Sequence, residues 1–323
     1  MTSKPNIETD YLSKILALDR RTAPFHPIKP RLQDQIKKER TGIKGESALT
    51  FPLKFLPGED ISIFHNPRLP DGNDYFEIDK LLLSKQYILM LEVKNWYGTL
   101  YFDGDRQVLR VGDDGREEGL PNPIIQVKLQ RHRLQKWLRM YNFPHVPILY
   151  FVVISFPSTI IKPLFPQSTV PNEVIYSKSL PFHIHEQNHI YTNQVLDQRT
   201  FQQIFDRIQA DHTPPKADVL KKFGISKNEL IKGVFCPECA ANPMKKEHNK
   251  WLCPQCHHAS RSAHLQALHD YKLLIGDTIT NQDAREFLRI DSSHVMKRIL
   301  QKEGFPVSGK NRWQKYTLDF GDR

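Results

Sequence analysis

Residues 74–94 read DYFEIDKLLLSKQYILMLEVK. The segments Asp74–Leu83 and Gln86–Val93 are rich in aliphatic and aromatic residues and contain neither Gly nor Pro, so each predicts a β-strand. Very few residues separate the two segments, which predicts a hairpin. We expect Lys85–Gln86 to form its two-residue loop.

This hairpin would bring charged side chains together. Paired positions then sum to 171, so that Asp79 lies opposite Glu92, and Lys94 lies opposite Glu77 on the same face. Two carboxylates opposite one another destabilise a strand pair unless something compensates their charge, and a divalent cation does so by coordination. The alternative is a solvated strand face with a Glu–Lys ion pair, which is the more common arrangement.

Further motifs surround the hairpin. In chain order they are Gly42-Ile-Lys-Gly-Glu46, Phe76-Glu-Ile-Asp79, Leu91-Glu-Val-Lys-Asn95, Gly98-Thr-Leu, Asn122-Pro-Ile-Ile-Gln126 and Trp137-Leu138. Over about residues 35–180 they resemble the nuclease-related domain (NERD) found in many bacterial proteins. That family is assigned to the PD-(D/E)XK restriction-endonuclease-like superfamily. The resemblance implies an α/β fold, with a mixed sheet flanked by helices.

The resemblance also implies a metal site. Asp79 and the triplet Glu92-Val-Lys94 match the D…(D/E)xK pattern of the superfamily. By this match Asp79, Glu92 and the carbonyl of Val93 would hold Mg²⁺ or Mn²⁺, and Glu46 would complete the site. Ile78 stands before Asp79, where the superfamily's name has Pro.

Two further residues receive roles from the same resemblance. Lys94 would position or deprotonate the attacking water and stabilise developing negative charge, and Gln126 would orient water or DNA. The implied catalytic residues are thus Glu46, Asp79, Glu92, Lys94 and Gln126.

The residues after the hairpin predict a helix and a buried strand. Ile124–Tyr141 lacks Gly and Pro and follows Pro123, which predicts a helix. One face would carry Val127, Leu134, Leu138 and Tyr141, and another Gln126, Gln130, Arg133 and Trp137. Val146–Ser155 is almost wholly apolar, as in a strand that is buried on both faces.

All four cysteines lie in two CxxC pairs, Cys236-Pro-Glu-Cys239 and Cys253-Pro-Gln-Cys256. Each pair places two thiolates on one tight turn, and two such turns complete a tetrahedral site for one structural Zn²⁺. A redox role would need only one pair. We expect His257 and His258 to be surface residues. The ribbon is expected to present Lys245, Lys246, Lys250 and Trp251 to a nucleic acid or a protein.

The C-terminal residues predict three helices and a hairpin. We expect helices over residues 264–275, from Thr280 or Asn281 to Arg289, and from Ser292 or Ser293 to Glu303. Residues 305–320 would form a wing-like hairpin. The segment ITNQDAREFLRIDSSHVMKRIL resembles winged-helix DNA-binding domains, in which the third helix enters the major groove.

This second resemblance implies a set of DNA contacts. The third helix would turn Met296, Ile299 and Leu300 inward. The expected DNA-binding residues are His294, Lys297, Arg298 and Gln301 on that helix, with Lys310 and Arg312 at the hairpin tip. The alternative is a small helical module with a solvated basic face.

The expected organisation has five parts. They are an N-terminal extension (1–34), a nuclease-like domain (35–208), a linker around the Pro214–Pro215 pair (209–229), a zinc ribbon (230–260) and a winged-helix-like domain (261–323). At about 150 residues per domain, a length of 323 residues suits about two domains of ordinary size.

Composition narrows the functional classes. No apolar run approaches the roughly 20 residues of a membrane span, and Met1–Asp10 lacks the apolar core of a signal peptide. Clustered cysteines favour metal binding in a reducing compartment, so we expect a cytoplasmic protein without a membrane partner. The net charge is +10, and the 108 residues from Lys216 onward hold 19 Lys/Arg against 12 Asp/Glu, which makes a polyanion a natural partner.

The leading interpretation is therefore a metal-dependent DNA endonuclease that binds DNA through its zinc ribbon and winged helix. The superfamily generally leaves a 5′-phosphate. The alternative is a DNA-binding regulator or adaptor whose nuclease fold is inactive. An RNA-processing role is a third interpretation, although the chain lacks an RNP-type aromatic motif. The sequence also allows a homodimer, and protein partners for the C-terminal region.

Overall fold

The computed structural model describes residues 10–55, 61–104, 106–310 and 313–321. Packing divides the chain into two compact units. The first, here called the sheet unit, comprises the described part of Arg40–Lys216. The second, the cysteine unit, joins Glu8–Glu39 to Ala217–Arg323, again as far as these are described. The helix α2 (Lys29–Ser47) begins in the cysteine unit and ends in the sheet unit.

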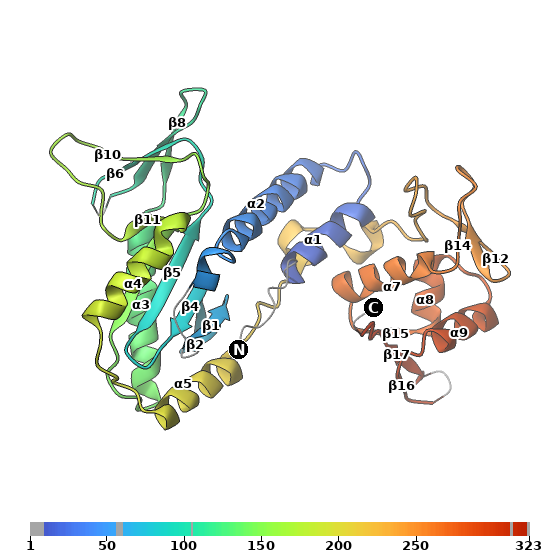
Figure 1. Ribbon diagram of the computed structural model, residues 1–323. Helices are drawn as coiled ribbons and strands as arrows, with labels where there is room; N and C mark the ends of the chain where they lie inside the picture. The colour runs from blue at the N-terminus through green and yellow to red at the C-terminus, as the bar shows by residue number, and fades with distance from the viewer. Residues whose placement is uncertain (1–9, 56–60, 105, 311–312, 322–323) are drawn as a thin grey trace. The chain divides into compact units, whose positions relative to one another are not determined.

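A five-stranded sheet forms the centre of the sheet unit (Figure 1). Its strands are, in spatial order, β1 (Ser62–His65), β4 (Lys80–Leu83), β5 (Ile88–Lys94), β9 (Ile148–Ile154) and β11 (Val174–Tyr176). The pairs β1–β4 and β4–β5 are antiparallel, whereas β5–β9 and β9–β11 are parallel. The mixed sheet confirms the expected mixed α/β class.

The β4–β5 hairpin confirms the predicted register. Leu83 pairs with Ile88 and Lys80 with Leu91, so paired positions sum to 171. Ser84 N donates to Tyr87 O at 3.1 Å and closes the loop Lys85–Gln86.

The first predicted strand, however, is two strands. β3 (Asp74–Glu77) pairs with β2 (Arg68–Asp71), and only β4 pairs with β5. Glu77 therefore faces Arg68, and the expected Glu77–Lys94 pairing is wrong. The backbone changes partner because Ile78 N donates to Pro67 O, and Asn66 N donates to Asp79 O.

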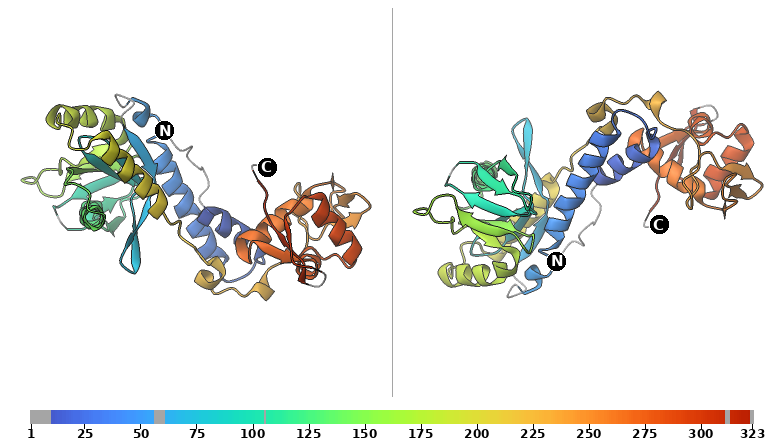
Figure 2. Two further views of the ribbon diagram at one scale, coloured as in Figure 1. Left: turned by 90° about the horizontal axis from the view of Figure 1, so that it is seen from below. Right: turned by 90° about the horizontal axis from the view of Figure 1, so that it is seen from above.

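Helices cover both faces of the sheet (Figure 2). Side chains alternate along β5, so Ile88 and Met90 pack on one face, and Leu89 and Leu91 on the other. The first face is covered by α3 (Pro123–Met140) and α5 (Gln198–Asp211), and the second by α4 (Leu180–Ile190).

The helix predicted after Pro123 is confirmed as α3. Asn122 caps it by accepting a hydrogen bond from Ile124 N. Trp137 was expected on its polar face but is 2% exposed, and its Nε1 donates to Asp211 Oδ2 at 2.9 Å. α5 therefore covers part of a face of α3 that the sequence pattern predicted to be polar.

Shorter elements complete the sheet unit. A second sheet has the order β10 (Ile160–Pro163), β6 (Thr99–Phe102), β7 (Val108–Val111) and β8 (Glu117–Leu120). Two 3₁₀ helices are η1 (Pro52–Phe55) and η2 (Ser177–Ser179).

The described residues of the cysteine unit form two small sheets and several helices. The first sheet is β12 (Lys245–Glu247), β13 (Lys250–Leu252) and β14 (Ala259–Ser260). Then follow α7 (Ala263–Leu274), β15 (Thr278–Thr280), α8 (Asn281–Leu288), α9 (Ser293–Lys302), β16 (Val307–Ser308) and β17 (Lys315–Thr317). The second sheet has the order β15-β17-β16. The predicted helices and the hairpin are confirmed, with Thr280 and Ser292 as helix caps.

The described part of the N-terminal segment is built into the cysteine unit. α1 (Asp10–Arg21) packs against α7 and α6 (Val219–Phe223). Arg21 is fully buried; its Nε donates to Asp270 Oδ2 at 2.7 Å, and its Nη1 donates to the carbonyls of Ile231 and Gly233. Arg20 Nη2 lies 2.6 Å from Asp270 Oδ1. α1 therefore supplies the cations that neutralise a buried carboxylate of α7.

The unit boundary between Lys216 and Ala217 falls inside the expected linker, which also contains α6 and the 3₁₀ helix η3 (Lys227–Glu229). None of the helices that the structure describes has the length and apolar character to cross a membrane.

Candidate nuclease-related site

Glu92 lies in the centre of the main sheet. β5 is flanked by β4 and β9, and Glu92 is only 1% exposed. Its Oε1 accepts a hydrogen bond from Lys94 Nζ at 2.5 Å. Its buried Oε2 has no hydrogen-bond partner among the described residues. A buried carboxylate oxygen without a partner is costly, so it marks a place for a cation or a donor.

Asp79 lies beside Glu92 because the chain leaves the β4 strand at this point. Its Oδ2 accepts a hydrogen bond from Val93 N at 2.7 Å, which ties it to β5. Burial, the largest cause, and repulsion from Glu92 raise the pKa of Asp79 to about 8, although the Val93 N–H opposes this. Two ionised carboxylates are thus unfavourable here without added positive charge.

Lys94 and Gln126 meet at the edge of this pair. Lys94 Nζ donates to Gln126 Oε1 at 3.1 Å and lies 5.7 Å from the ring centroid of Trp96. Gln126 projects from the first turn of α3, whose start is held by Asn122. The predicted residues Asp79, Glu92, Lys94 and Gln126 are therefore brought together.

Glu46 reaches the same region through a close helix–sheet contact. A Cβ on Gly45 would lie 2.6 Å from Asn95 Cβ and 3.0 Å from Ser155 Oγ, so only glycine permits this approach of α2. Asn95 Nδ2 also donates to Thr41 O. The glycine of the first motif thus places Glu46 near β5.

Glu46 does not bond to the other carboxylates directly. Its Oε2 lies 2.6 Å from Lys80 Nζ, and its Oε1 accepts from Asn66 Nδ2 at 3.2 Å. Glu46 still contributes to the raised pKa of Asp79 by repulsion. Among the described residues, no three of these oxygens converge as a ready metal group.

Sequence reasoning missed Lys80 and Asn66. The Lys80 side chain is 5% exposed and compensates Glu46, while Asn66 bridges both, with Lys80 Nζ 3.4 Å from Asn66 Oδ1. The sequence did hold a signal for Lys80, which directly precedes the apolar run Leu81-Leu82-Leu83. A lysine at the start of a buried strand requires a partner for its charge. Asn66 adopts a positive φ of 52°, which a sequence does not show.

Residues 41–155 match the family model of the nuclease-related domain. This confirms the resemblance for the segment that holds Glu46, Asp79, Glu92, Lys94 and Gln126. No curated protein and no solved structure matches the chain. The matched segment ends directly after β9, so the cysteine pairs and the C-terminal helices lie beyond the matched residues.

The donor chemistry of Asp79 and Glu92 fits a hard divalent cation. Glu92 offers a buried oxygen that has no partner in the described part of the chain, and Asp79 offers a carboxylate that added positive charge would ionise. Mg²⁺ and Mn²⁺ prefer such oxygen ligands, usually one or two carboxylates with water.

Outside the nuclease-related domain, the four cysteines form a second cluster. Their Sγ atoms all lie within 4.8 Å of one another, with 3.6 Å between Cys236 and Cys256, and 3.5 Å between Cys239 and Cys253. The N–H of Cys256, the largest cause, lowers the pKa of the Cys253 thiol to about 6. The cluster can hold a metal ion, and four thiol ligands suit Zn²⁺.

Two turns of the same shape build this cluster. Ala240 N donates to Cys236 O, and His257 N donates to Cys253 O. Ala240 and His257 both have positive φ, at 57° and 59°. His257 is exposed, as expected for a surface residue, whereas its neighbour His258 is half-buried.

The expected DNA-binding residues lie on one helix face and on the hairpin. His294, Lys297, Arg298 and Gln301 are exposed on α9, whereas Met296, Ile299 and Leu300 are buried as predicted. Lys310 is exposed, and Arg312 lies outside the described residues.

One expected surface residue is buried. Trp251 is 1% exposed, and its Nε1 donates to His264 Nδ1 at 3.1 Å. The prediction that the ribbon presents it to a partner is wrong, because β13 packs its indole into the core shared with α7. Lys245 and Lys250 are exposed, and Lys246 is half-buried.

Proposed function

We propose that this chain is a metal-dependent DNA endonuclease that hydrolyses phosphodiester bonds. The match to the nuclease-related domain supports a nuclease-related function, and the mixed sheet with helices on both faces suits a restriction-endonuclease-like fold. The observation that carries the proposal is the buried Oε2 of Glu92, which has no hydrogen-bond partner among the described residues and lies close to Asp79 and Lys94.

In this proposal the carboxylates of Asp79 and Glu92 and the carbonyl of Val93 hold Mg²⁺ or Mn²⁺. Glu46 takes part directly or through water. The bound cation lowers the pKa of water and stabilises charge on the phosphoryl oxygens. The chain supports this chemistry by ionising Asp79, whose proton leaves more readily when positive charge is near.

Lys94 and Gln126 act on water and phosphate. The Nζ of Lys94, now shared between Glu92 and Gln126, can donate to the attacking water or to a non-bridging phosphate oxygen. The exposed amide of Gln126 can orient water or a DNA backbone from the start of α3.

The cysteine unit is proposed to hold the DNA. The order α7, β15, α8, α9, β16, β17 supports a winged-helix assignment, with α9 entering the major groove and the β16–β17 hairpin as the wing. One structural Zn²⁺ on the four cysteines would stabilise the ribbon. Four thiolates leave no open coordination position, so this zinc takes no part in cleavage.

Cleavage of plasmid and linear DNA with and without Mg²⁺ or Mn²⁺ tests the proposal. We expect cleavage only with the cation, and a loss of at least about 100-fold in Glu92→Gln, because that variant removes a charged metal ligand. Glu117→Gln is the matched control, since Glu117 is an exposed glutamate of β8. Equal cleavage by both variants would show that the site is assigned wrongly.

The alternative, an inactive DNA-binding adaptor, gives a different result in the same experiment. The chain would then bind DNA, and no cation would produce cleavage. The Lys80–Glu46 ion pair favours this alternative in one respect, since Lys80 already compensates the charge that Glu46 would offer to a cation.

A further inference from the structure

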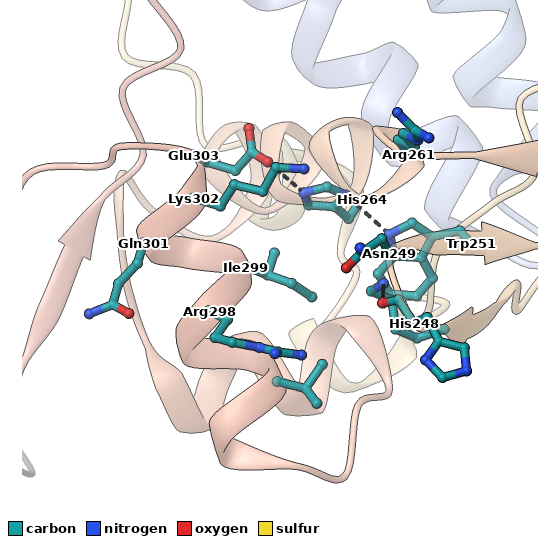
Figure 3. A pocket seen from close by; sticks show the side chains of 12 residues that line it. His248, Asn249, Trp251, Arg261, His264, Arg298, Ile299, Gln301, Lys302 and Glu303 are labelled. Atoms are coloured by element: carbon teal, nitrogen blue, oxygen red, sulfur yellow. Dashed lines mark hydrogen bonds and ion pairs between the residues drawn. The ribbon is translucent and has the colours of Figure 1, made fainter.

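A cavity of about 420 Å³ lies in the cysteine unit between the β12–β13 hairpin and α9 (Figure 3). The hairpin contributes Lys246, His248, Asn249 and Trp251, and α9 contributes Arg298, Ile299, Gln301 and Lys302. Arg261 and His264 come from the chain between them and from α7. The ribbon and the three-helix module therefore build this cavity together.

The lining is strongly cationic. Lys246, Arg261, Arg298 and Lys302 contribute four positive charges, and Glu303 contributes the one carboxylate among the lining residues that the structure describes. Glu303 Oε1 already lies 3.1 Å from His264 Nε2. The lining thus carries a net charge of +3 at neutral pH with His neutral.

Three of these cations have no partner in the described part of the chain. No hydrogen bond or ion pair joins the side chains of Arg261, Arg298 or Lys302 to protein atoms there. Arg298 and Lys302 extend from α9 toward the cavity (Figure 3). Cations that come from separate elements and face one space repel one another unless an anion joins them.

Lys246 shows this crowding. Its Nζ donates to His248 O and lies 3.4 Å from Lys250 O, which holds the ammonium at the cavity wall. Burial, the largest cause, and the charges of Lys302 and Arg298 lower the pKa of Lys246. Burial, the largest cause, also lowers the pKa of His264, and the charges of Lys246 and Lys302 lower it further.

The floor of the cavity is rigid. His264 is 4% exposed and is held from both sides, since its Nδ1 accepts from Trp251 Nε1 and its Nε2 pairs with Glu303. The rings of Trp251 and His264 stack at a centroid distance of 5.9 Å. A fixed floor with cations on its rim is a preorganised site for an anion.

We propose that this cavity binds a phosphate group, with Arg261, Arg298 and Lys302 as its charged ligands. Arginine and lysine are the side chains that proteins use for phosphate recognition, and arginine can bind two oxygens at once. The phosphate can belong to the backbone of a DNA strand or to a free phosphate compound. The site requires no cleavage activity in the sheet unit.

Binding of inorganic phosphate to the zinc-loaded full chain, without Mg²⁺, tests whether a free phosphate compound occupies the cavity. In isothermal titration calorimetry we expect one site per chain. The variant Arg261→Gln/Lys302→Gln should weaken it at least about tenfold. Both side chains are exposed, so the variant should fold normally. The matched control is Lys221→Gln/Lys227→Gln, which removes the same charge from exposed positions outside the cavity.

Duplex DNA tests the other source with the same two double variants. If a backbone phosphate occupies the cavity, the plot of log K against log salt should become less steep in the cavity variant only, by about 0.9 in slope magnitude for each lost phosphate contact. If inorganic phosphate binds and the cavity variant weakens this binding, the result supports a free phosphate compound as the occupant. If only the salt dependence of DNA binding changes in the cavity variant, the result supports a backbone phosphate of DNA. If both double variants bind phosphate equally and show equal DNA slopes, the site does not exist. A cleavage defect would not affect either measurement.

Discussion

At the scale of single residues, the ionisation of Asp79 makes the stability of the folded chain depend on pH. The pKa of its carboxyl is raised from its ordinary value of 3.8 to about 8, so the folded chain binds a proton that the unfolded chain has lost. Between about pH 4 and pH 8 the contribution of this group to stability therefore decreases as pH rises. Above about pH 8 both Asp79 and Glu92 are ionised in the folded chain, and their burial and mutual repulsion lower its stability most.

Asp79→Asn should consequently stabilise the metal-free chain near pH 8 and change it little near pH 4. The amide removes the repulsion with Glu92 and can still accept from Val93 N. Urea unfolding at both pH values, followed by hydrogen exchange in β5, measures the difference. Mg²⁺ should stabilise the unsubstituted chain by about 2.7 kcal/mol at 100 times its Kd, and the variant much less. A variant less stable than the unsubstituted chain at pH 8 would contradict the assigned repulsion.

Lys80 and Glu46 provide a second test at this scale. The Lys80 side chain is 5% exposed, and that of Glu46 is 26% exposed, so the pair is only weakly screened. Lys80→Met should lower the free energy of unfolding by about 1.5 to 3 kcal/mol, because Glu46 loses its charged donor.

The double variant Lys80→Met/Glu46→Gln should recover part of that loss. A double-mutant cycle in metal-free buffer measures the coupling, which we expect to be between about 0.5 and 3 kcal/mol. Strictly additive effects would mean that the two side chains do not act as a pair.

At the scale of elements, α2 can approach the end of β5 because Gly45 has no side chain. Gly45→Ala would place its Cβ 2.6 Å from Asn95 Cβ, so the helix must shift. We expect the sheet unit to lose about 1 to 3 kcal/mol from overpacking, and Glu46 to move with the helix. Thermal unfolding and the metal dependence of cleavage report these two effects.

The same helix offers a matched control. A Cβ on Gly42 would meet nothing within 4 Å. Gly42→Ala should therefore stabilise α2 by about 0.5 to 1 kcal/mol through helix propensity alone. If both alanines stabilised the chain, the close approach of α2 to Asn95 would be incorrect.

At the scale of the whole molecule, the ends of the chain share one unit. Arg21 and Asp270 are both fully buried, and 249 residues separate them in the sequence. Arg21→Met should destabilise the cysteine unit by about 3 kcal/mol, because a buried carboxylate loses its main partner. Hydrogen exchange should then rise in α7 and α8 and remain unchanged in β5 and β9.

Arg20→Met serves as the comparison for this prediction. The Arg20 side chain is 36% exposed, so its pair with Asp270 should contribute about 1 kcal/mol or less. A fragment that begins near residue 218 would lack both arginines and leave Asp270 without them. We expect such a fragment to be stable only when residues 8–39 are supplied.

The local features of this protein follow from the types and the order of neighbouring residues. The apolar segments and the length of the loop between them predicted the β4–β5 register. Cap residues predicted where α8 and α9 begin. The spacing of the two CxxC pairs predicted that the four cysteines lie together. In each case the interacting groups are near in the chain, so residue type and period are sufficient. The motifs also identified the segment that matches the nuclease-related domain.

The long-range partners, by contrast, became visible in the three-dimensional fold. It paired Glu46 with Lys80, buried Trp137 under α5 and Trp251 against α7, and joined Arg21 to Asp270. It also turned the chain at Ile78, where β3 leaves the sheet to pair with β2. These contacts join elements far apart in sequence, and which face of an element is covered depends on its neighbours rather than on its own pattern.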